Sequence, residues 1–326
     1  MVTARQFTEL PFDILEPIFG YLTSEADRYN ARRAFPCLQS VIDSTKIHVG
    51  RYWFAMNDRS AYFDIDSVVV KEFKSWGYDC TVPRGINMTR ESYNQLCIAK
   101  EFQFVMRQPK LELEELDIHY EHVKHEHRET CTRYFKNALK TIKHQIQVKE
   151  VCFETQNLDP VMTVLPSLKP GFLEKIEIEE YYKTLDSDFM RELVQTEQWK
   201  QAQRVILRGA CCEMIQMEHF WHFKEFRVKV DNLTKEHMEQ IRDILLTSPH
   251  LEIAEFQIKN YTYPSPRTLM TSVFPEVDFE LTDRGWWCSY GVPGPHGLYY
   301  FTLKDESIEI RKHGIEIRRQ GIRIWN

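Results

Sequence analysis

A strand-type pattern of apolar positions recurs along the middle of the chain. Its template is apolar-x-x-apolar-x-apolar, and the first positions of successive copies are 21 to 35 residues apart. The copies are Leu113, Leu116, Ile118; Val148, Val151, Phe153; Leu173, Ile176, Ile178; Ala202, Val205, Leu207; Phe223, Phe226, Val228; and Ile253, Phe256, Ile258. Alternating β and α units at this interval favour a βα solenoid that resembles leucine-rich repeats. An ordinary α/β sheet with short crossovers is the alternative.

Helical spacing lies between these strands, because apolar residues recur there with the 3.6-residue period. The expected helical faces are Phe135, Leu139, Ile142, Ile146; Phe189, Met190, Leu193, Val194; and Met238, Ile241, Ile244, Leu245, the last helix being capped by Thr234. The inward Asn or Cys of regular leucine-rich repeats is replaced in every copy by another residue. The sequence therefore predicts an irregular repeat without an Asn ladder.

The first 44 residues predict a small helical module. Asp13 and Glu16 have the spacing of a capping box, and Ser24 is placed to cap a second helix that ends at Pro36. A third helix is expected over Cys37–Ile42. Three helices in so few residues form no core of their own. The module therefore needs a partner to cover its apolar face, or packs on the rest of this chain.

The flanks of the repeat region have different patterns. Tyr62–Val70 reads as strand and Tyr93–Met106 as helix, ended by Pro109. After a boundary at Tyr263–Pro266 the pattern is β, with Ile pairs spaced for short strands. Those pairs are Ile308 and Ile310, Ile315 and Ile317, and Ile322 and Ile324, with Glu309, Arg311, Glu316, Arg318 and Arg323 on the outer face. We expect four regions, which are 1–44, 45–110, 111–263 and 264–326.

Charge and composition narrow the class of protein. The chain has 326 residues and a formal net charge of −6, so it lacks the basic surplus of a nucleic-acid binder. Its longest uncharged stretch, Gly285–Leu303, contains Gly and Pro and does not read as a membrane helix. The start of the chain has no signal-peptide pattern. We therefore expect a cytoplasmic or nuclear protein whose eight Cys are reduced.

Motifs for catalysis or nucleotide binding are absent from the sequence. Gly is only 12 of 326 residues, and no phosphate loop, nucleophile elbow or HExxH occurs. The histidines His119, His122, His125 and His127 are close together, but they lie among acidic residues without the Cys spacing of structural zinc sites. Trp199 is interpreted as core, Cys211 and Cys212 as buried thiols, and His219 and His222 as half-buried. No catalytic residue, metal or cofactor is expected.

The N-terminal segment FTELPFDILEPIFGYLTSEADRYNARRAF resembles an F-box, which has Leu-Pro, an Ile/Leu-rich helix and an Arg-containing second helix. The middle of the chain resembles the FTH domain of the large nematode F-box family. The segments that carry this resemblance are LEKIEIEEYY (173–182), EQWKQAQRVILRG (197–209) and HFWHFKEFRVKVDNLTKEHMEQIRDIL (219–245). The order, F-box first and FTH second, is that of the family.

The resemblance implies a non-catalytic adaptor of a cullin-based ubiquitin ligase. The F-box would dock on a Skp-type adaptor, and the FTH-like region would hold a protein substrate. The implied anchors are Leu10, Pro11, Ile14, Leu15, Ile18, Phe19 and Leu22. Pro17 inside the first helix and the lack of a Trp near Cys37 depart from the family pattern. The alternatives are an interaction scaffold without ligase activity and, more distantly, a nucleic-acid binder that uses the Arg-bearing tail.

A charged recognition surface is expected on the strands of the repeat. In a solenoid, residues between the apolar template positions point away from the core. The candidates are Glu114, Glu115, Asp117, Glu174, Lys175, Glu177, Arg227 and Lys229.

Overall fold

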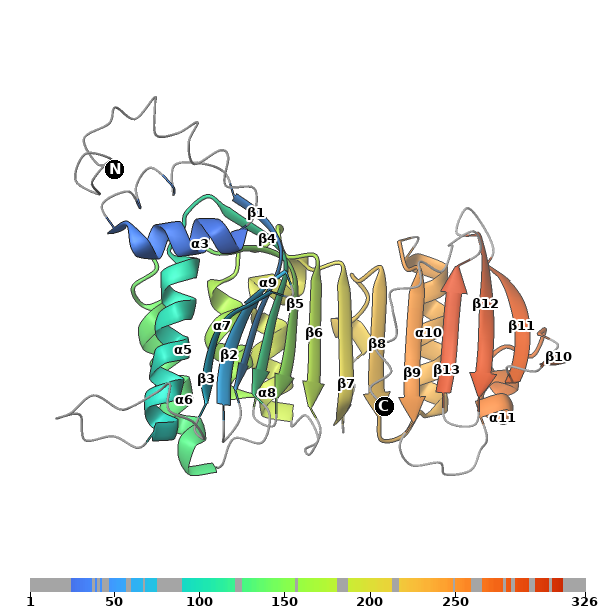
Figure 1. Cartoon of the computed structure of the whole chain (residues 1–326). Helices are drawn as coiled ribbons and strands as arrows, with labels where there is room; N and C mark the ends of the chain where they lie inside the picture. The colour runs from blue at the N-terminus through green and yellow to red at the C-terminus, as the bar shows by residue number, and fades with distance from the viewer. Residues whose placement is uncertain are drawn as a thin grey trace. The chain divides into compact units, whose positions relative to one another are not determined.

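The computed structural model (Figure 1) describes the residues in the following ranges. They are 25–36, 39, 42, 47–56, 60–66, 68–74, 90–120, 125–155, 158–180, 187–212, 217–248, 250–258, 266–277, 280–282, 285–292, 297–304 and 307–312. The chain divides into two compact units. The first unit is residues 1–182 with 195–202, and the second is 183–194 with 203–326. Both units combine strands with helices, which confirms the mixed α/β class.

The first unit is built on a sheet in the order β6-β5-β4-β1-β2-β3. Its described elements are α3 (Glu25–Ala34), β1 (Ile47–Met56), β2 (Ser60–Ile65), β3 (Val68–Lys74), α5 (Arg90–Met106), β4 (Leu111–Tyr120), α6 (His125–Leu139), β5 (Gln147–Thr155), α7 (Asp159–Val164), η2 (Leu165–Ser167), β6 (Lys175–Glu180) and α9 (Glu197–Gln201). Strands β1, β4, β5 and β6 run parallel, whereas β2 and β3 are added antiparallel.

The apolar template positions of this sheet lie in register across neighbouring strands. Leu116 on β4 is opposite Val151 on β5, and Val151 is opposite Ile176 on β6. These side chains are at most 1% exposed, and full burial of an aliphatic side chain stabilises a fold by about 1.5–3 kcal/mol. Helix α5 covers the same face, and the ring centroid of its Phe102 lies 5.2 Å from that of Phe54 on β1. The regular spacing of apolar residues therefore produces one continuous core face.

The second unit is built on a sheet in the order β10-β11-β12-β13-β9-β8-β7. Its described elements are α8 (Ser187–Gln195, except its last residue), β7 (Arg204–Cys212), η3 (Met217–His219), β8 (Glu225–Val230), α10 (Lys235–Thr247), β9 (Ile253–Ile258), α11 (Pro266–Val273), β10 (Glu280–Thr282), β11 (Gly285–Val292), β12 (Gly297–Lys304) and β13 (Ser307–Lys312). Strands β7, β8 and β9 are parallel, and the remaining neighbours pair antiparallel.

Several expected helices are present with the expected faces. Helix α5 includes all of the predicted Tyr93–Met106. Helix α10 begins after Thr234, whose hydroxyl accepts a hydrogen bond from the amide of His237, and the four predicted apolar residues of its face are buried. Helix α6 ends at Leu139, whereas the expected helical face extends to Ile146. Ile146 instead forms a β-bridge with Leu168, so the last apolar residue of that pattern belongs to the start of the next strand.

Two sequence predictions about strands need correction, and one copy of the template pairs out of register. Tyr62–Val70 is two strands, since the chain turns at Asp66 between β2 and β3. The region after the predicted 263–266 boundary begins with helix α11 before its strands. On β9 the template is displaced by two residues, because Val228 pairs with Phe256 and Phe226 pairs with Ala254. A shift of two keeps the same face, so the core is preserved.

The N-terminal module is described only in part. Helix α3 was expected as its second helix, and it packs on α5 through the buried side chains of Tyr29 and Arg32. The anchor residues Leu10, Pro11, Ile14, Leu15, Ile18, Phe19 and Leu22 lie outside the described residues. The terminal Ile pairs after residue 312 do so as well. Among the helices that are described, none has the length and hydropathy needed to cross a membrane.

Candidate recognition surface

The parallel strands of the first unit carry polar side chains on the face opposite to their apolar core positions. We call this surface the charged face. It consists of Arg51 and Trp53 on β1; Glu115, Asp117 and His119 on β4; Glu150, Cys152 and Glu154 on β5; and Lys175, Glu177 and Glu179 on β6. The strands align them in cross-strand rows. Arg51, Glu115, Glu150 and Lys175 form the first row, whereas Trp53, Asp117, Cys152 and Glu177 form the second.

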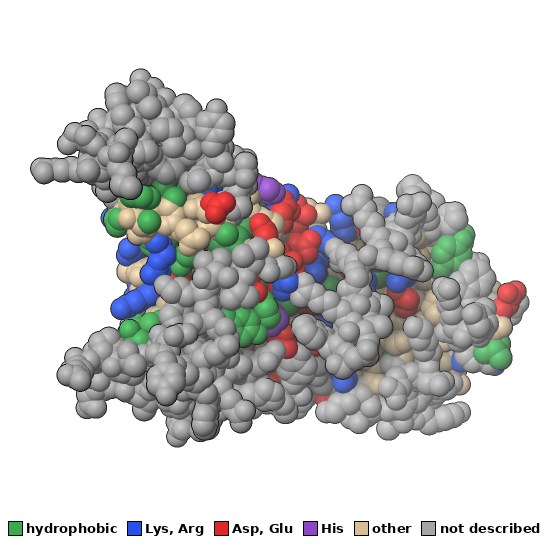
Figure 2. Space-filling model, viewed as in Figure 1, with side chains coloured by type: hydrophobic (Ala, Val, Ile, Leu, Met, Phe, Trp, Pro, Cys, Tyr) green, Lys and Arg blue, Asp and Glu red, His purple; other side chains and the backbone are tan. Residues whose placement is uncertain are grey.

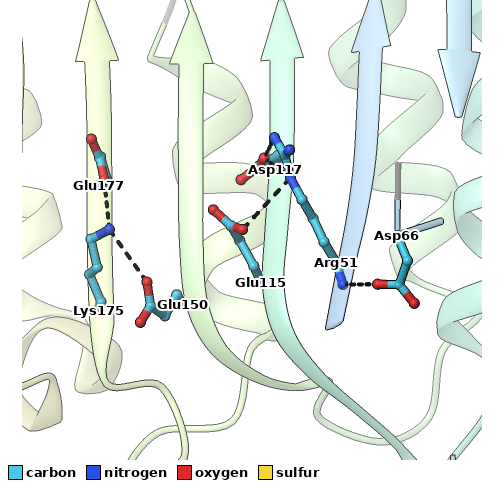
Figure 3. Close-up of polar contacts among 7 residues, drawn as sticks. All are labelled: Arg51, Asp66, Glu115, Asp117, Glu150, Lys175 and Glu177. Carbon is cyan, nitrogen blue, oxygen red and sulfur yellow. Dashed lines mark hydrogen bonds and ion pairs between the residues drawn. The ribbon is translucent and has the colours of Figure 1, made fainter. Parts of the chain in front are cut away.

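Arg51 is positioned from both sides (Figure 3). Its backbone amide donates to the Asp66 carboxylate at 2.7 Å, and its carbonyl accepts from the Asp66 amide at 2.9 Å. Its guanidinium donates to Oδ2 of Asp117 through two nitrogens and lies 3.7 Å from the Glu115 carboxylate. One cation is therefore shared by two carboxylates of neighbouring β4 positions.

Lys175 is shared in the same way on β6. Its ammonium lies 2.8 Å from the Glu177 carboxylate and 3.4 Å from the Glu150 carboxylate (Figure 3). Burial lowers the pKa of Lys175, but the two carboxylates outweigh that effect and raise the pKa above its ordinary value. Lys175 is consequently charged at neutral pH, although its side chain is only 11% exposed.

For the Glu115 carboxyl group, the effects that disfavour the charged form are the stronger ones. Burial and the neighbouring charge of Asp117 raise its pKa, whereas the charges of Arg51 and Lys175 lower it less strongly. Like charges at short range disfavour a second ionised carboxylate. The two β4 carboxylates therefore have less positive charge beside them than would neutralise both.

Trp53 and His119 form the aromatic part of the charged face. Their rings meet edge to face with centroids 5.3 Å apart, and the Arg51 guanidinium lies 5.6 Å from the Trp53 ring centroid. His119 also contacts the Glu154 carboxylate at 2.8 Å through Nδ1. The aromatic rings are thereby held between charged groups on both sides.

Two buried polar atoms of the second row have no hydrogen-bond partner. They are Oδ1 of Asp117, an acceptor, and Nε1 of Trp53, a donor. Asp117 is only 2% exposed, and Trp53 lies directly opposite it in register. A buried polar group without a partner costs about 1–3 kcal/mol. This row thus holds an unsatisfied acceptor beside an unsatisfied donor.

The charged face has more carboxylates than cations. Six carboxylates, on Glu115, Asp117, Glu150, Glu154, Glu177 and Glu179, stand against two cations, on Arg51 and Lys175. Figure 2 shows Asp and Glu side chains gathered with Lys and Arg over the strands of the first unit. This side of the sheet is therefore electronegative and suited to a cationic partner.

Cys152 lies between these charges and is not an activated nucleophile. Burial raises the pKa of its thiol well above the ordinary value, and the negative charges of Asp117 and Glu177 raise it further. The thiolate is the reactive form of cysteine. The charged face therefore offers ionic and hydrogen-bonding contacts rather than nucleophilic chemistry.

Several recognition residues predicted from the sequence meet on this face, namely Glu115, Asp117, Lys175 and Glu177. Glu114 is not part of the two rows, and its carboxylate lies 2.7 Å from the ammonium of Lys149. Glu174 comes directly before the first residue of β6. Arg227 and Lys229 lie on β8 of the second unit, where Arg227 contacts Glu225 at 2.8 Å and Glu255 at 3.5 Å. The predicted surface is thus divided between the units.

Sequence reasoning missed Arg51, Trp53, Glu150 and Glu154. The template spacing applied to Val148–Phe153 marks Glu150 as facing away from the core, so that residue was within reach of the same argument. The segment of β1 also fits the template, at Val49, Tyr52 and Phe54, so the same spacing marks Arg51 and Trp53 as facing away from the core. No sequence signal placed Arg51 beside Asp117, 66 residues further along the chain.

The other residues singled out from the sequence lie in several places in the fold. Trp199 is 1% exposed, which confirms its interpretation as core. His219 and His222 are half-buried. Of the histidine cluster, His119 lies on β4, and His125 and His127 lie on the first turn of α6. Among the described residues, no group of three His, Cys, Asp or Glu side chains is close enough to hold a metal ion.

Comparison with known proteins adds independent information. The model of the FTH domain family matches residues 129–272. F-box A protein 224 of Caenorhabditis elegans is 27% identical to the chain over 162 residues, which cover 49% of this chain and 41% of that protein. The match thus spans about two-fifths of the relative's length. No solved structure matches the chain.

Proposed function

Because the chain belongs to the nematode F-box and FTH-domain family, we propose that it is a substrate-recognition adaptor of a Skp/cullin/F-box ubiquitin ligase. Its N-terminal region, 1–44, docks on a Skp-type adaptor and through it on a cullin. The FTH-like region, 111–263, binds a protein substrate. The chain itself is non-catalytic and acts in the cytoplasm or nucleus.

The observation that carries this proposal is the FTH match at 129–272 in a chain whose curated relative is named an F-box protein. The order of the two regions gives it further support, since the F-box-like segment precedes the FTH match. The docking anchors are Leu10, Pro11, Ile14, Leu15, Ile18, Phe19 and Leu22. Aliphatic anchors on a helix face commonly carry most of the energy of such an interface.

We interpret the alternating units as an irregular solenoid of the leucine-rich-repeat type. Supporting this, β4, β5 and β6 are parallel neighbours in chain order, and their template residues stand opposite one another. Residues 264–326 form a β-rich extension that follows these units. In this arrangement the strands present their polar faces as a recognition surface.

Copurification with a Skp-type adaptor tests the proposed docking. The parent chain is expected to bind the adaptor, and Leu10→Ala/Pro11→Ala/Ile14→Ala is expected to lose it, since a central anchor is worth about 2 kcal/mol or more. Leu281→Ala removes an apolar side chain that is 68% exposed in the second unit and serves as the control. Unchanged binding by the triple variant would contradict the docking assignment.

The alternative is an interaction scaffold that binds the adaptor without directing ubiquitination. Abundance measurements separate the two functions. If the chain is a ligase receptor, replacing the parent by the triple variant raises the steady-state level of the substrate. If the chain is a scaffold, the same replacement leaves the abundance of every bound partner unchanged.

A further inference from the structure

The second row of the charged face combines two incomplete interactions. Oδ1 of Asp117 is a buried acceptor without a donor, and Nε1 of Trp53 is a buried donor without an acceptor. The two residues are cross-strand partners on β1 and β4. A single ligand that carries both a donor and an acceptor at adjacent positions can satisfy both atoms.

The surrounding charge specifies the donor. Arg51 uses Oδ2 of Asp117 and lies 3.7 Å from Glu115, so one guanidinium faces two carboxylates. Lys175 likewise faces Glu150 and Glu177. A further ammonium or guanidinium over Asp117 and Glu115 would correct this imbalance, and hydrogen bonds between charged groups are stronger than neutral ones.

We propose that the charged face binds an extended, positively charged segment of a partner protein, with a Lys or Arg side chain over Asp117 and Glu115. This proposal rests on the proposed function, because it names the class of substrate that the adaptor presents. An extended segment also offers a backbone carbonyl to Nε1 of Trp53. A polyamine supplies positive charge but has no carbonyl, so the Trp53 donor favours a peptide.

The same chemistry argues against nucleic acid on this surface. Phosphates need cations, and both cations of the charged face are already held by carboxylates at 2.8 to 3.7 Å or by direct hydrogen bonds. A phosphate backbone would meet six carboxylates and be repelled. The electronegative face therefore selects a cationic protein segment.

Fluorescence anisotropy with the full chain tests this proposal. The probe is a labelled dodecapeptide of alternating Lys and Ser, and the comparison peptide has Glu in place of Lys. The parent is expected to bind the Lys peptide in low salt and to bind it more weakly in high salt. It is expected to show no binding of the Glu peptide. Failure of the Lys peptide to bind the parent would overturn the proposal.

The variant Glu115→Gln/Glu150→Gln removes two charges from the face and leaves each cation one carboxylate. Arg51 keeps Asp117, and Lys175 keeps Glu177. We expect the dissociation constant of the Lys peptide to rise about fivefold or more. Glu115→Gln alone is the second variant, to be used if the double variant unfolds, with a smaller rise in the same direction.

The matched control is Glu192→Gln/Glu276→Gln. Both control residues are exposed and lie in the second unit, and the control has the same net charge as the charged-face variant. Its affinity for the Lys peptide should equal that of the parent. Equal weakening by the two double variants would mean that only the total charge matters, and that result would overturn a site on the charged face.

The Trp53 donor distinguishes a peptide from a polyamine. Trp53→Phe keeps a ring and removes Nε1, so it should weaken the Lys peptide about threefold or more while leaving spermine binding unchanged. A variant that weakens both ligands equally, or neither, would overturn the extended-peptide assignment.

The adaptor copurification keeps this inference separate from the proposed function. Glu115→Gln/Glu150→Gln should retain the Skp-type adaptor, whereas the Leu10, Pro11 and Ile14 triple variant should retain the Lys peptide. A parent chain that binds the adaptor but not the Lys peptide refutes only the charged-face site. A parent chain that binds the Lys peptide but not the adaptor refutes only the proposed function.

Discussion

Tyr29 on α3 donates a buried hydrogen bond to the carboxylate of Glu101 on α5, 72 residues further along the chain. Arg33 forms an ion pair with the same carboxylate, and Arg32 places its guanidinium 4.2 Å from the centroid of the Phe104 ring. Helix α3 belongs to the segment that resembles an F-box, whereas α5 covers the core face of the sheet. The contact therefore ties one helix of the proposed docking module directly to the body of the first unit.

Removing the Tyr29 hydroxyl should weaken this tie. Tyr29→Phe keeps the ring, whose centroid lies 5.5 Å from that of Phe63, and deletes the hydrogen bond to a charged group. We expect the free energy of unfolding to fall by about 1.5–3 kcal/mol, measured by urea denaturation. In a hydrogen-exchange measurement on this variant, the backbone amides of α3 should exchange faster than those of β4 and β5.

Tyr134→Phe on α6 is the control, since it deletes a hydroxyl from a half-buried position of the same unit. Its effect should stay within about 0.5 kcal/mol. Equal stability losses for the two tyrosines would show that the Tyr29 hydroxyl has no special part in holding α3.

Gly50→Ala should disturb the position of Arg51. A Cβ at residue 50 would lie 2.7 Å from the Asp66 carboxylate oxygen that accepts from the Arg51 amide. Asp66 has limited freedom to move, because its φ of 50° already lies in the left-handed region. We expect a loss of about 1–3 kcal/mol in the free energy of unfolding.

A double-mutant cycle checks the cause of that loss. In an Asp66→Ala background the blocking oxygen is gone, so adding Gly50→Ala should cost less than it does in the parent. Additive costs for the two substitutions would place the strain elsewhere than at the Asp66 carboxylate.

The core strands of the first unit were predictable because one spacing repeats. Leu116, Val151 and Ile176 each occupy the second template position, and the parallel strands place them opposite one another. The period-2 alternation then indicates which polar residues face away from the core, and Asp117 and Glu177 were found in that way. A local pattern was sufficient where strands with the same spacing of apolar residues pair side by side.

The ion pairs of the charged face could not be predicted from the sequence. Arg51 reaches Asp117 because β1 pairs parallel with β4. The spacing of Val49, Tyr52 and Phe54 fits the template, but it does not say which strand is the neighbour of β1. The unpartnered Oδ1 of Asp117 depends in addition on side-chain conformation. The end of α6 was also missed, since an apolar Ile146 fits a helix face and a β-bridge equally well in sequence.

Cys152 should react slowly in the folded protein. Burial and the nearby carboxylates raise the pKa of its thiol, so almost none is thiolate at neutral or mildly alkaline pH. Alkylation with iodoacetamide at pH 8, followed by peptide mass mapping, should leave Cys152 unmodified while the chain is folded. The same residue should react fully in urea, and rapid native alkylation at Cys152 would contradict its assigned environment.

The capping box of α10 should make the stability of the second unit sensitive to mild acid. Nδ1 of His237 accepts from the Thr234 amide at 3.2 Å, which requires a neutral ring. Burial lowers the pKa of His237 in the folded state, and the charge of Glu236 opposes this only in part. In the unfolded chain the ring takes up a proton near its ordinary pKa of about 6.5.

As the pH falls below about 6.5, the unfolded state therefore binds more protons than the folded state, and stability decreases until the folded-state pKa is passed. Above about pH 7.5 both states are neutral and this contribution is constant. The loss at acid pH should be about 1 kcal/mol, the value of a helix cap.

His237→Gln keeps an acceptor in the capping box and removes the titration. Urea denaturation of both proteins between pH 7.5 and 5 should show the parent losing stability relative to the variant, because all other titrating groups are common to the two. Parallel stability curves over this range would show that the His237 ring has no depressed pKa and does not cap α10 in its neutral form.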